Sequence, residues 1–354
     1  MVKGKNAVLT AAPADWQVVP TFGLSHSFEL LENCLKKVVV IGGSGHIGTY
    51  LIPLLVEQGF EVASVSRGKA KPYFNDEVAW RRVEQLTLDR ASEELANTFG
   101  ARVADLRPDI VIDLISFTLD STQSLVEALR DKVEHFLHCS TVWVHGHLEA
   151  VPADETAVLN PFGDYGVNKA AIEEWLLHEA RLTGFPATVF RPGHIVGPGW
   201  LPIGPYGNFD AEVFSLIASG KEVTLPNFGL ETVHHVHASD VARFILLAIS
   251  NRFASVGESF NVVSEKALTL RGYAAAMYRW FGHPPRISFR PFDSWKEAHS
   301  RELAHHAWEH ISRSHSFSIG KASKRVGYRP RFTSLEAIKE SVLAAIAAGK
   351  IEIP

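Results

Sequence analysis

Three side chains in the middle of the chain have the types and spacing needed for acid–base chemistry. Tyr165 and Lys169 are four residues apart in a strongly helical run, so both lie on one face of the predicted helix. A phenol titrates near about 10 in water, and a neighbouring ammonium group favours its ionised form. Thr141, at the carboxyl end of a predicted strand, is placed to hydrogen-bond a reacting oxygen. The set predicts proton exchange with a substrate hydroxyl group.

A glycine-rich turn joins a predicted strand to a predicted helix near residue 42. The strand, residues 38–41, consists of four β-branched residues, as in strands that are buried on both faces. Gly42 suits a sharp turn, Gly45 lets the backbone approach a pyrophosphate, and Gly48 lets the helix pack closely on the strand. The turn predicts dinucleotide binding, with contacts at Gly42, Gly45, His46, Ile47 and Gly48.

The ends of the next predicted strands supply further cofactor contacts. In dinucleotide folds the strand at 61–66 ends beside the adenosine ribose, where a carboxylate suits NAD and an arginine suits NADP. Here Ser66 is followed by Arg67, which favours NADP over NAD, unless Arg67 is only a solvated loop charge or stacks on adenine. Asp89 follows a third strand and is placed to meet the adenine edge. The strand at 110–115 ends near the two remaining contacts of this kind, Leu114 and Ser116.

Strands and helices alternate over the first half of the chain. This pattern predicts an α/β fold, a doubly wound parallel sheet of the Rossmann type, with a smaller C-terminal substrate-binding lobe. We predict an N-terminal appendage at residues 1–35 and a dinucleotide-binding domain at 36–195. Residues 196–354 form mainly the substrate lobe, with 258–264 returning to the sheet.

The composition limits the class of function. A net charge of −4 gives no reason to expect nucleic-acid or anionic-membrane binding. Two cysteines exclude a disulfide scaffold and favour a reducing compartment. No apolar run has the length of a membrane span, and the first residues lack a signal-peptide core. We therefore expect a cytoplasmic protein whose partner is a small-molecule substrate.

Histidine is unusually common, with 17 residues. Two groups recur, one at 234–237 and one at 305–315. No cysteine or suitably spaced carboxylate accompanies them, so we predict no metal site. Hydrogen bonding to a polar substrate and ordinary packing remain the two interpretations. His237 and Trp200, which lies in a loop near the presumed pocket mouth, are the predicted substrate contacts.

From about residue 36 to residue 345 the chain resembles an extended short-chain dehydrogenase/reductase of the NAD-dependent epimerase/dehydratase superfamily. The resemblance implies Tyr165 as acid/base, Lys169 as its activator and a ribose ligand, and Thr141 as the substrate-orienting hydroxyl. It also implies that Pro192 and His194 lie near the nicotinamide, and that the protein is a homodimer. The motifs that carry it are the glycine turn and the segments 140–146, 165–169, 191–198, 236–242 and 260–262.

Two departures from this pattern concern the substrate. Nucleotide-sugar epimerases of the superfamily carry a diphosphate-binding arginine where this chain has Val233, and an R-x-G-D segment that is missing from 309–315. Nothing in the sequence shows that Arg313 or Arg290 compensates. Val142, which follows Thr141, is not an acid, so dehydration is the least favoured reaction.

The predicted function is that of an NAD(P)-dependent oxidoreductase or epimerase. It would act by hydride transfer at a carbinol carbon of a sugar-like or other small polar substrate. One alternative is a nucleotide-sugar epimerase. The other is a non-catalytic dinucleotide-binding sensor or RNA-associated protein.

Overall fold

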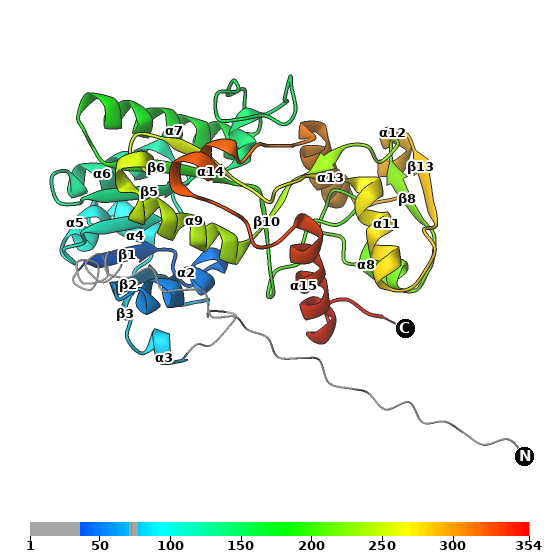
Figure 1. Ribbon diagram of the computed structural model, residues 1–354, viewed down its shortest axis with the longest axis horizontal. Coiled ribbons are helices and arrows are strands. Elements are labelled where there is room, and N and C mark those ends of the chain that lie inside the picture. The colour runs from blue at the N-terminus through cyan, green and yellow to red at the C-terminus, as the bar shows by residue number, and fades with distance from the viewer. Residues whose placement is uncertain (1–35, 71, 73–76, 354) are drawn as a thin grey trace, which may run out of the picture.

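The computed structural model describes residues 36–70, 72 and 77–353, so the appendage predicted at 1–35 lies outside the described residues. A seven-stranded parallel sheet has the order β11-β6-β5-β4-β1-β2-β3 (Figure 1). With β1 inside the sheet and later strands added on both sides of it, the predicted doubly wound fold is confirmed. The strands are β1 (Lys37–Ile41), β2 (Glu61–Ser66), β3 (Glu84–Thr87), β4 (Ile110–Asp113), β5 (His135–Cys139), β6 (Ala187–Pro192) and β11 (Ser259–Val262).

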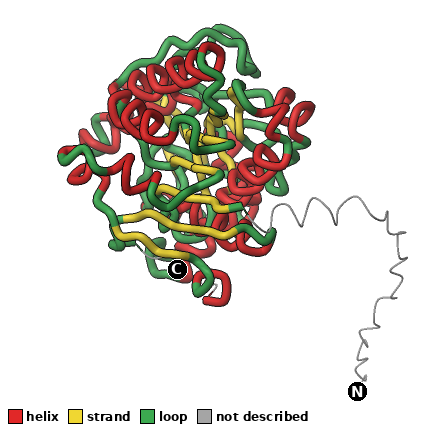
Figure 2. The backbone as a smooth tube through the Cα atoms, turned by 90° about the vertical axis from the view of Figure 1, so that its left-hand side faces the viewer, coloured by secondary structure: helices red, strands yellow, loops and turns green. Residues whose placement is uncertain are grey.

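Helices cover both faces of this sheet, and the strands lie between them (Figure 2). Val38 and Val40 of β1 face one core, and Val39 and Ile41 face the other, because successive strand residues point to opposite sides. The first core contains α2 (His46–Glu57), α3 (Glu77–Trp80), α9 (Ala238–Ser250) and α14 (Gly320–Val326). The second contains α5 (Phe99–Ala104), α6 (Leu119–Leu129) and α7 (Asp164–Leu182).

A second lobe has its own apolar core, to the right in Figure 1. Trp295 and Tyr273 are fully buried there. Its helices are α8 (Glu212–Ala218), α11 (Leu270–Trp280), α12 (Phe292–Lys296), α13 (Arg301–Arg313) and α15 (Ser334–Ala347). Three short strand pairs accompany them: β7 (His194–Val196) with β10 (His235–His237), β8 (Val223–Pro226) with β13 (Ile287–Arg290), and β9 (Thr232–Val233) with β12 (Leu268–Thr269).

The C-terminal half of the chain is shared between the two cores. Besides β11, the helices α9, α10 (Arg252–Ser255) and α14 lie with the sheet. More of this half therefore returns to the sheet than the segment 258–264 that the sequence indicated. Within the described residues, no helix is both long and apolar enough to cross a membrane.

The helical segment that follows β3 is divided in two. The structure has α4 (Arg90–Leu95) and then α5, which are separated by Asn97 at φ +56°. Asparagine adopts the left-handed region more readily than most residues, and such a residue ends a helix. The break lets the Phe99 side chain enter the core, where it is buried.

Candidate active site

The glycine turn is closely packed at the carboxyl end of β1. Gly42 has φ +86°, and its N–H donates to the carbonyl oxygen of Val65 in β2 at 2.8 Å. A Cβ atom on Gly48 would lie 2.0 Å from the carbonyl oxygen of Gly43, so only a hydrogen fits there. In the described part of the chain no side chain caps the start of α2. Its first N–H groups therefore suit a diphosphate.

A cavity of about 510 Å³ opens on one side of Gly45. Arg67 lines it after β2, and Asp89 lines it after β3. The Asp89 carboxylate also caps α4, where it accepts the N–H of Ser92 at 3.3 Å. We call this cavity the adenosine half of the site, because it holds the two residues predicted to meet the adenosine.

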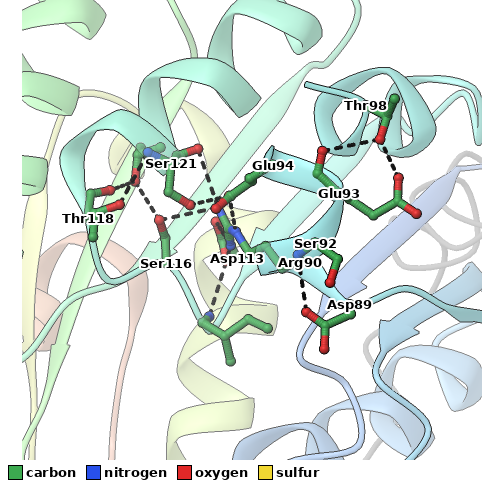
Figure 3. A network of polar contacts seen from close by, with 12 residues as sticks. Asp89, Arg90, Ser92, Glu93, Glu94, Thr98, Asp113, Ser116, Thr118 and Ser121 are labelled. Atoms are coloured by element: carbon green, nitrogen blue, oxygen red, sulfur yellow. Dashed lines mark hydrogen bonds and ion pairs between the residues drawn. The ribbon is translucent and has the colours of Figure 1, made fainter. Parts of the chain in front are cut away.

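A buried polar network lies against the adenosine half, which Arg90, Glu94 and Ser121 help to line (Figure 3). Arg90 Nη1 donates to both carboxylate oxygens of Asp113 at 2.9 Å, and Arg90 Nε donates to Glu94 at 2.7 Å. Arg90 Nη2 reaches the hydroxyl of Ser116 at 3.3 Å and the carbonyl oxygen of Ser121 at 3.4 Å. Asp113 and Ser116 are fully buried. The network ties the first turn of α4 to the end of β4.

A second cavity, of about 400 Å³, lies on the other side of Gly45. Both cavities are lined by Gly42, Gly45, Ile115 and Phe117, so they form one cleft past the carboxyl ends of the parallel strands. This is where ligands bind in open α/β sheets. We call the second cavity the reaction half. Of the predicted residues it contains Gly42, Gly45, His46, Ile47, Leu114, Thr141, Tyr165, Pro192, His194 and Trp200.

Thr141 and Tyr165 meet in the reaction half. Thr141 begins the short helix η1 (Val142–His145), and its hydroxyl accepts the N–H of Trp143 at 3.3 Å. Tyr165 lies in the first turn of α7, with its ring 5.8 Å from that of Trp143. Desolvation raises the pKa of Tyr165 to about 12, although the ring remains partly exposed to the cleft. A hydrogen bond with Thr141 opposes the rise in this pKa.

Lys169 lies one helical turn further on but does not line the cleft. Its Nζ donates to the carbonyl oxygens of Ser116 and Cys139, both at 2.6 Å, and the side chain is buried. Burial lowers the pKa of Lys169. In the ligand-free chain desolvation of the phenol dominates, so the lowering of the pKa of Tyr165 stays a prediction for the chain with bound cofactor.

Three other predicted residues lie outside the cleft lining. Gly48 packs against Gly43, and the hydroxyl of Ser116 shares a hydrogen bond with Thr122. His237 caps α9 by accepting the N–H of Ser239, and its Nε2 lies 3.2 Å from a carboxylate oxygen of Glu340. The structure thus places His237 between helices.

The residues considered as substitutes for a diphosphate-binding arginine also lie away from the cleft lining. The guanidinium of Arg313 lies 3.8 Å from the ring centroids of both Trp143 and Phe162, and it donates to the Phe162 carbonyl at 2.8 Å. Arg290 lies in β13, and Val233 is fully buried. Within the described residues no group of three or more His, Cys, Asp or Glu is placed to hold a metal ion.

Sequence reasoning missed several residues of the cleft. His310, from α13, joins His194 in the reaction half, with 4.9 Å between the ring centroids. Phe117 and Phe209 line the same cavity. The only sequence signal for the network of the adenosine half was that Arg90 directly follows Asp89. The partner of Arg90, Asp113, comes from a different strand.

Comparison with known proteins identifies the family of the chain. The sequence profile of the NAD dependent epimerase/dehydratase family matches residues 38–262. The chain is 25% identical to the chloroplast stem-loop binding protein of 41 kDa b from Arabidopsis thaliana, over 86% of this chain and 78% of that protein. It is also 25% identical to UDP-glucose 4-epimerase from Streptomyces lividans, over 70% of this chain and 82% of that protein.

Solved structures share the fold. An epimerase from Methanothermobacter thermautotrophicus superposes with a TM-score of 0.69 and 20% identity, covering 91% of this chain and 96% of that one. UDP-glucose 4-epimerase from Thermotoga maritima, solved with UDP-glucose, gives 0.67 and 22% identity, covering 88% and 99%. Together with the profile match over most of the chain, these findings establish that the protein belongs to the NAD-dependent epimerase/dehydratase family.

Proposed function

We propose that this protein transfers hydride at a carbinol carbon of a small substrate, as a dehydrogenase or an epimerase. In this proposal Tyr165 exchanges the hydroxyl proton, Thr141 orients the oxygen and Lys169 supports Tyr165. The supporting observation is that the hydroxyl groups of Thr141 and Tyr165 meet inside a cleft that begins at the glycine turn. One substrate oxygen can contact both hydroxyls.

The residues of the cleft fit a dinucleotide. Gly48 admits no Cβ, so α2 starts close enough to the turn for its N–H groups to hold a diphosphate. Asp89 would meet the adenine, while Pro192 and His194 would lie beside the nicotinamide. When bound and oxidised, the nicotinamide supplies a hydride acceptor and a positive charge.

The proton follows a short route. The substrate hydroxyl donates to the Tyr165 oxygen, and Thr141 holds the substrate oxygen while the carbon loses hydride. Two carbonyl oxygens accept hydrogen bonds from the buried Nζ of Lys169, which offsets part of the cost of its desolvation. Those carbonyls belong to Ser116 and Cys139, at the ends of two sheet strands, so the sheet fixes the ammonium group relative to Tyr165.

The choice of cofactor is a separate part of the proposal. Arg67 and Lys69 line the adenosine half, and the last residue of β2 is Ser66 rather than an acid. A ribose 2′-phosphate therefore finds cations here, which favours NADP. We expect NADP⁺ to bind more tightly than NAD⁺ in calorimetric titration, and Arg67→Ala to weaken NADP⁺ binding selectively. Tighter binding of NAD⁺ to the unsubstituted protein would refute this preference.

The catalytic assignment is tested with Tyr165→Phe. The purified protein is mixed with NADP⁺ or NAD⁺ and a panel of sugars, sugar acids and polyols, and reduced dinucleotide and epimerised product are both measured. We expect a loss of at least about 100-fold in turnover, the usual size of a general acid–base contribution. Tyr273→Phe is the matched control, since its hydroxyl is buried in the other lobe without a hydrogen-bond partner among the described residues.

Turnover that persists in Tyr165→Phe at the unsubstituted rate would contradict this assignment. It would favour the second candidate, a dinucleotide-binding protein without chemistry. That candidate is supported by the similarity to the Arabidopsis stem-loop binding protein, and filter binding to a stem-loop RNA tests it directly. The homodimer stays a prediction, and its proposed interface is formed by α6 and α7, which lie side by side.

A further inference from the structure

The reaction half of the cleft has an unusual charge pattern. Among the described residues that line it, none is aspartate, glutamate, lysine or arginine. Burial lowers the pKa of His46 and of His310 to about 4, and it holds that of His194 well below its usual range. Burial also raises the pKa of the Cys139 thiol to about 11. All these groups are neutral near pH 7.

Aromatic side chains form the walls of this half. Phe117, Trp200 and Phe209 are each about half exposed, at 52%, 47% and 46%. Large apolar side chains that remain exposed together around one cavity indicate a ligand surface. Trp200 is stacked on His46, with 4.6 Å between ring centroids, which fixes one wall. Trp143 forms another wall beside Tyr165.

The polar side chains that line this cavity are uncharged hydrogen-bonding groups. His194 projects from β7 and His310 from α13, so two segments that are far apart in the chain each contribute one imidazole. His310 is held by a hydrogen bond of 2.6 Å between its Nδ1 and the carbonyl oxygen of His306. With Thr141 and Tyr165, these rings can recognise hydroxyl groups of a substrate.

The two cations beside the reaction half do not line it, and both donate to backbone carbonyl oxygens. Lys169 Nζ lies 5.0 Å from the ring centroid of Phe117 and donates to Ser116 and Cys139. Arg313 is enclosed by two aromatic rings and donates to the backbone carbonyl of Phe162. Val233 is buried in the apolar core of the second lobe. A phosphate or carboxylate entering the reaction half would lose its hydration without gaining a hydrogen bond from a charged side chain of the lining, which is unfavourable.

We propose that the substrate of this cleft is an uncharged ring compound with a secondary hydroxyl group, bound between aromatic side chains and carrying neither phosphate nor carboxylate. This inference rests on the proposed function, because it assigns a substrate class to the same site. It distinguishes this chain from relatives named for nucleotide-sugar substrates.

The test measures binding to the full chain saturated with NADP⁺, by calorimetry. Phenyl β-D-glucoside and phenyl β-D-glucuronide form the matched pair, since they differ in one carboxylate. Myo-inositol and 1-phenylethanol extend the neutral group, while glucose 1-phosphate and UDP-glucose extend the anionic group. We expect at least one neutral probe to bind tenfold or more tightly than every anionic probe.

Two variants test the roles of the aromatic wall and of the missing charge. Trp200→Ala removes an exposed wall without disturbing a core and should weaken the best neutral probe about tenfold. Phe209→Arg introduces a cation and should raise the affinity for phenyl β-D-glucuronide relative to the glucoside. Equal or tighter binding of any anionic probe to the unsubstituted protein, or failure of all neutral probes to bind, would overturn the inference.

The two proposals fail in different ways. Turnover of a charged substrate that is lost in Tyr165→Phe would overturn the substrate class and leave the proposed function intact. Turnover that survives in Tyr165→Phe would overturn the proposed function, whatever the charge of the substrate.

Discussion

Replacing Arg90 with methionine tests whether the buried network of Figure 3 stabilises the carboxyl end of β4, beside the cleft. Arg90 Nη1 contacts both oxygens of Asp113 at 2.9 Å, and the carboxylate is fully buried. Among the described residues, the N–H of Ile115 also donates to Asp113, at 3.1 Å. Methionine keeps most of the side-chain volume but leaves a buried carboxylate without its counter-charge.

The expected loss of folding stability in Arg90→Met is large. Breaking a buried ion pair by removing one partner destabilises a protein by about 3–5 kcal/mol. An unfolding entropy of about 2.1 cal/mol/K per residue gives about 0.7 kcal/mol/K for 354 residues. Arg90→Met should therefore lower the melting temperature by about 4–7 °C. Circular dichroism and tryptophan fluorescence, recorded in one buffer at fixed ionic strength, measure the change.

Two controls separate the buried charge from other effects. In the double variant Arg90→Met, Asp113→Leu no charge is left buried at this position, so it should lose less stability than Arg90→Met alone. Lys296→Met removes an exposed pair with Asp293 and should shift the melting temperature by less than about 1 °C. A shift below about 1 °C in Arg90→Met, or a double variant less stable than the single one, would refute the reasoning.

Two further predictions concern the buried histidines and the glycine turn. Burial lowers the pKa of His145 and His234 to about 4 and that of His315 to about 3, so the unfolded state binds protons first as pH falls below about 6.5. The contribution of these histidines to the unfolding free energy should be complete above pH 6.5 and should fall towards pH 4, by about 1.4 kcal/mol per pH unit for each histidine. His315→Gln should reduce the slope of the unfolding free energy against pH by about 1.4 kcal/mol per pH unit. Gly48→Ala places a Cβ 2.0 Å from a backbone oxygen, so its affinity for NADP⁺, measured by calorimetry, should drop at least tenfold. Gly320→Ala is the control, because its Cβ meets only a serine hydroxyl, at 3.2 Å. Equal NADP⁺ affinities of the two variants would contradict the steric argument.

Much of the fold could be predicted from local patterns. The strand Lys37–Ile41 is buried on both faces, and its β-branched run indicates that directly. The glycine turn was identified because each glycine solves a short-range steric problem, as Gly48 beside Gly43 illustrates. Tyr165 and Thr141 were found because a helix start and a strand end both face the carboxyl edge of a parallel sheet.

The rest depends on contacts between distant segments, for which a single sequence has no local signal. His310 reaches the cleft because α13 of the second lobe packs beside β7, more than 100 residues away in the chain. Lys169 was placed on the correct helix face, but its two carbonyl partners come from the ends of β4 and β5. His237 was expected at the substrate, and the structure instead uses it to cap α9.

The placement of Lys169 bears on when the proposed base can act. Desolvation raises the pKa of Tyr165 to about 12, so its phenol is protonated at neutral pH in the ligand-free chain. Carbonyl oxygens of Ser116 and Cys139 hold the Lys169 ammonium group and partly offset its charge. A second positive charge must therefore enter the cleft before the phenolate forms, and an oxidised nicotinamide carries one. In this scheme Tyr165 accepts a proton only when a hydride acceptor is present, which couples the two transfers at the substrate carbon.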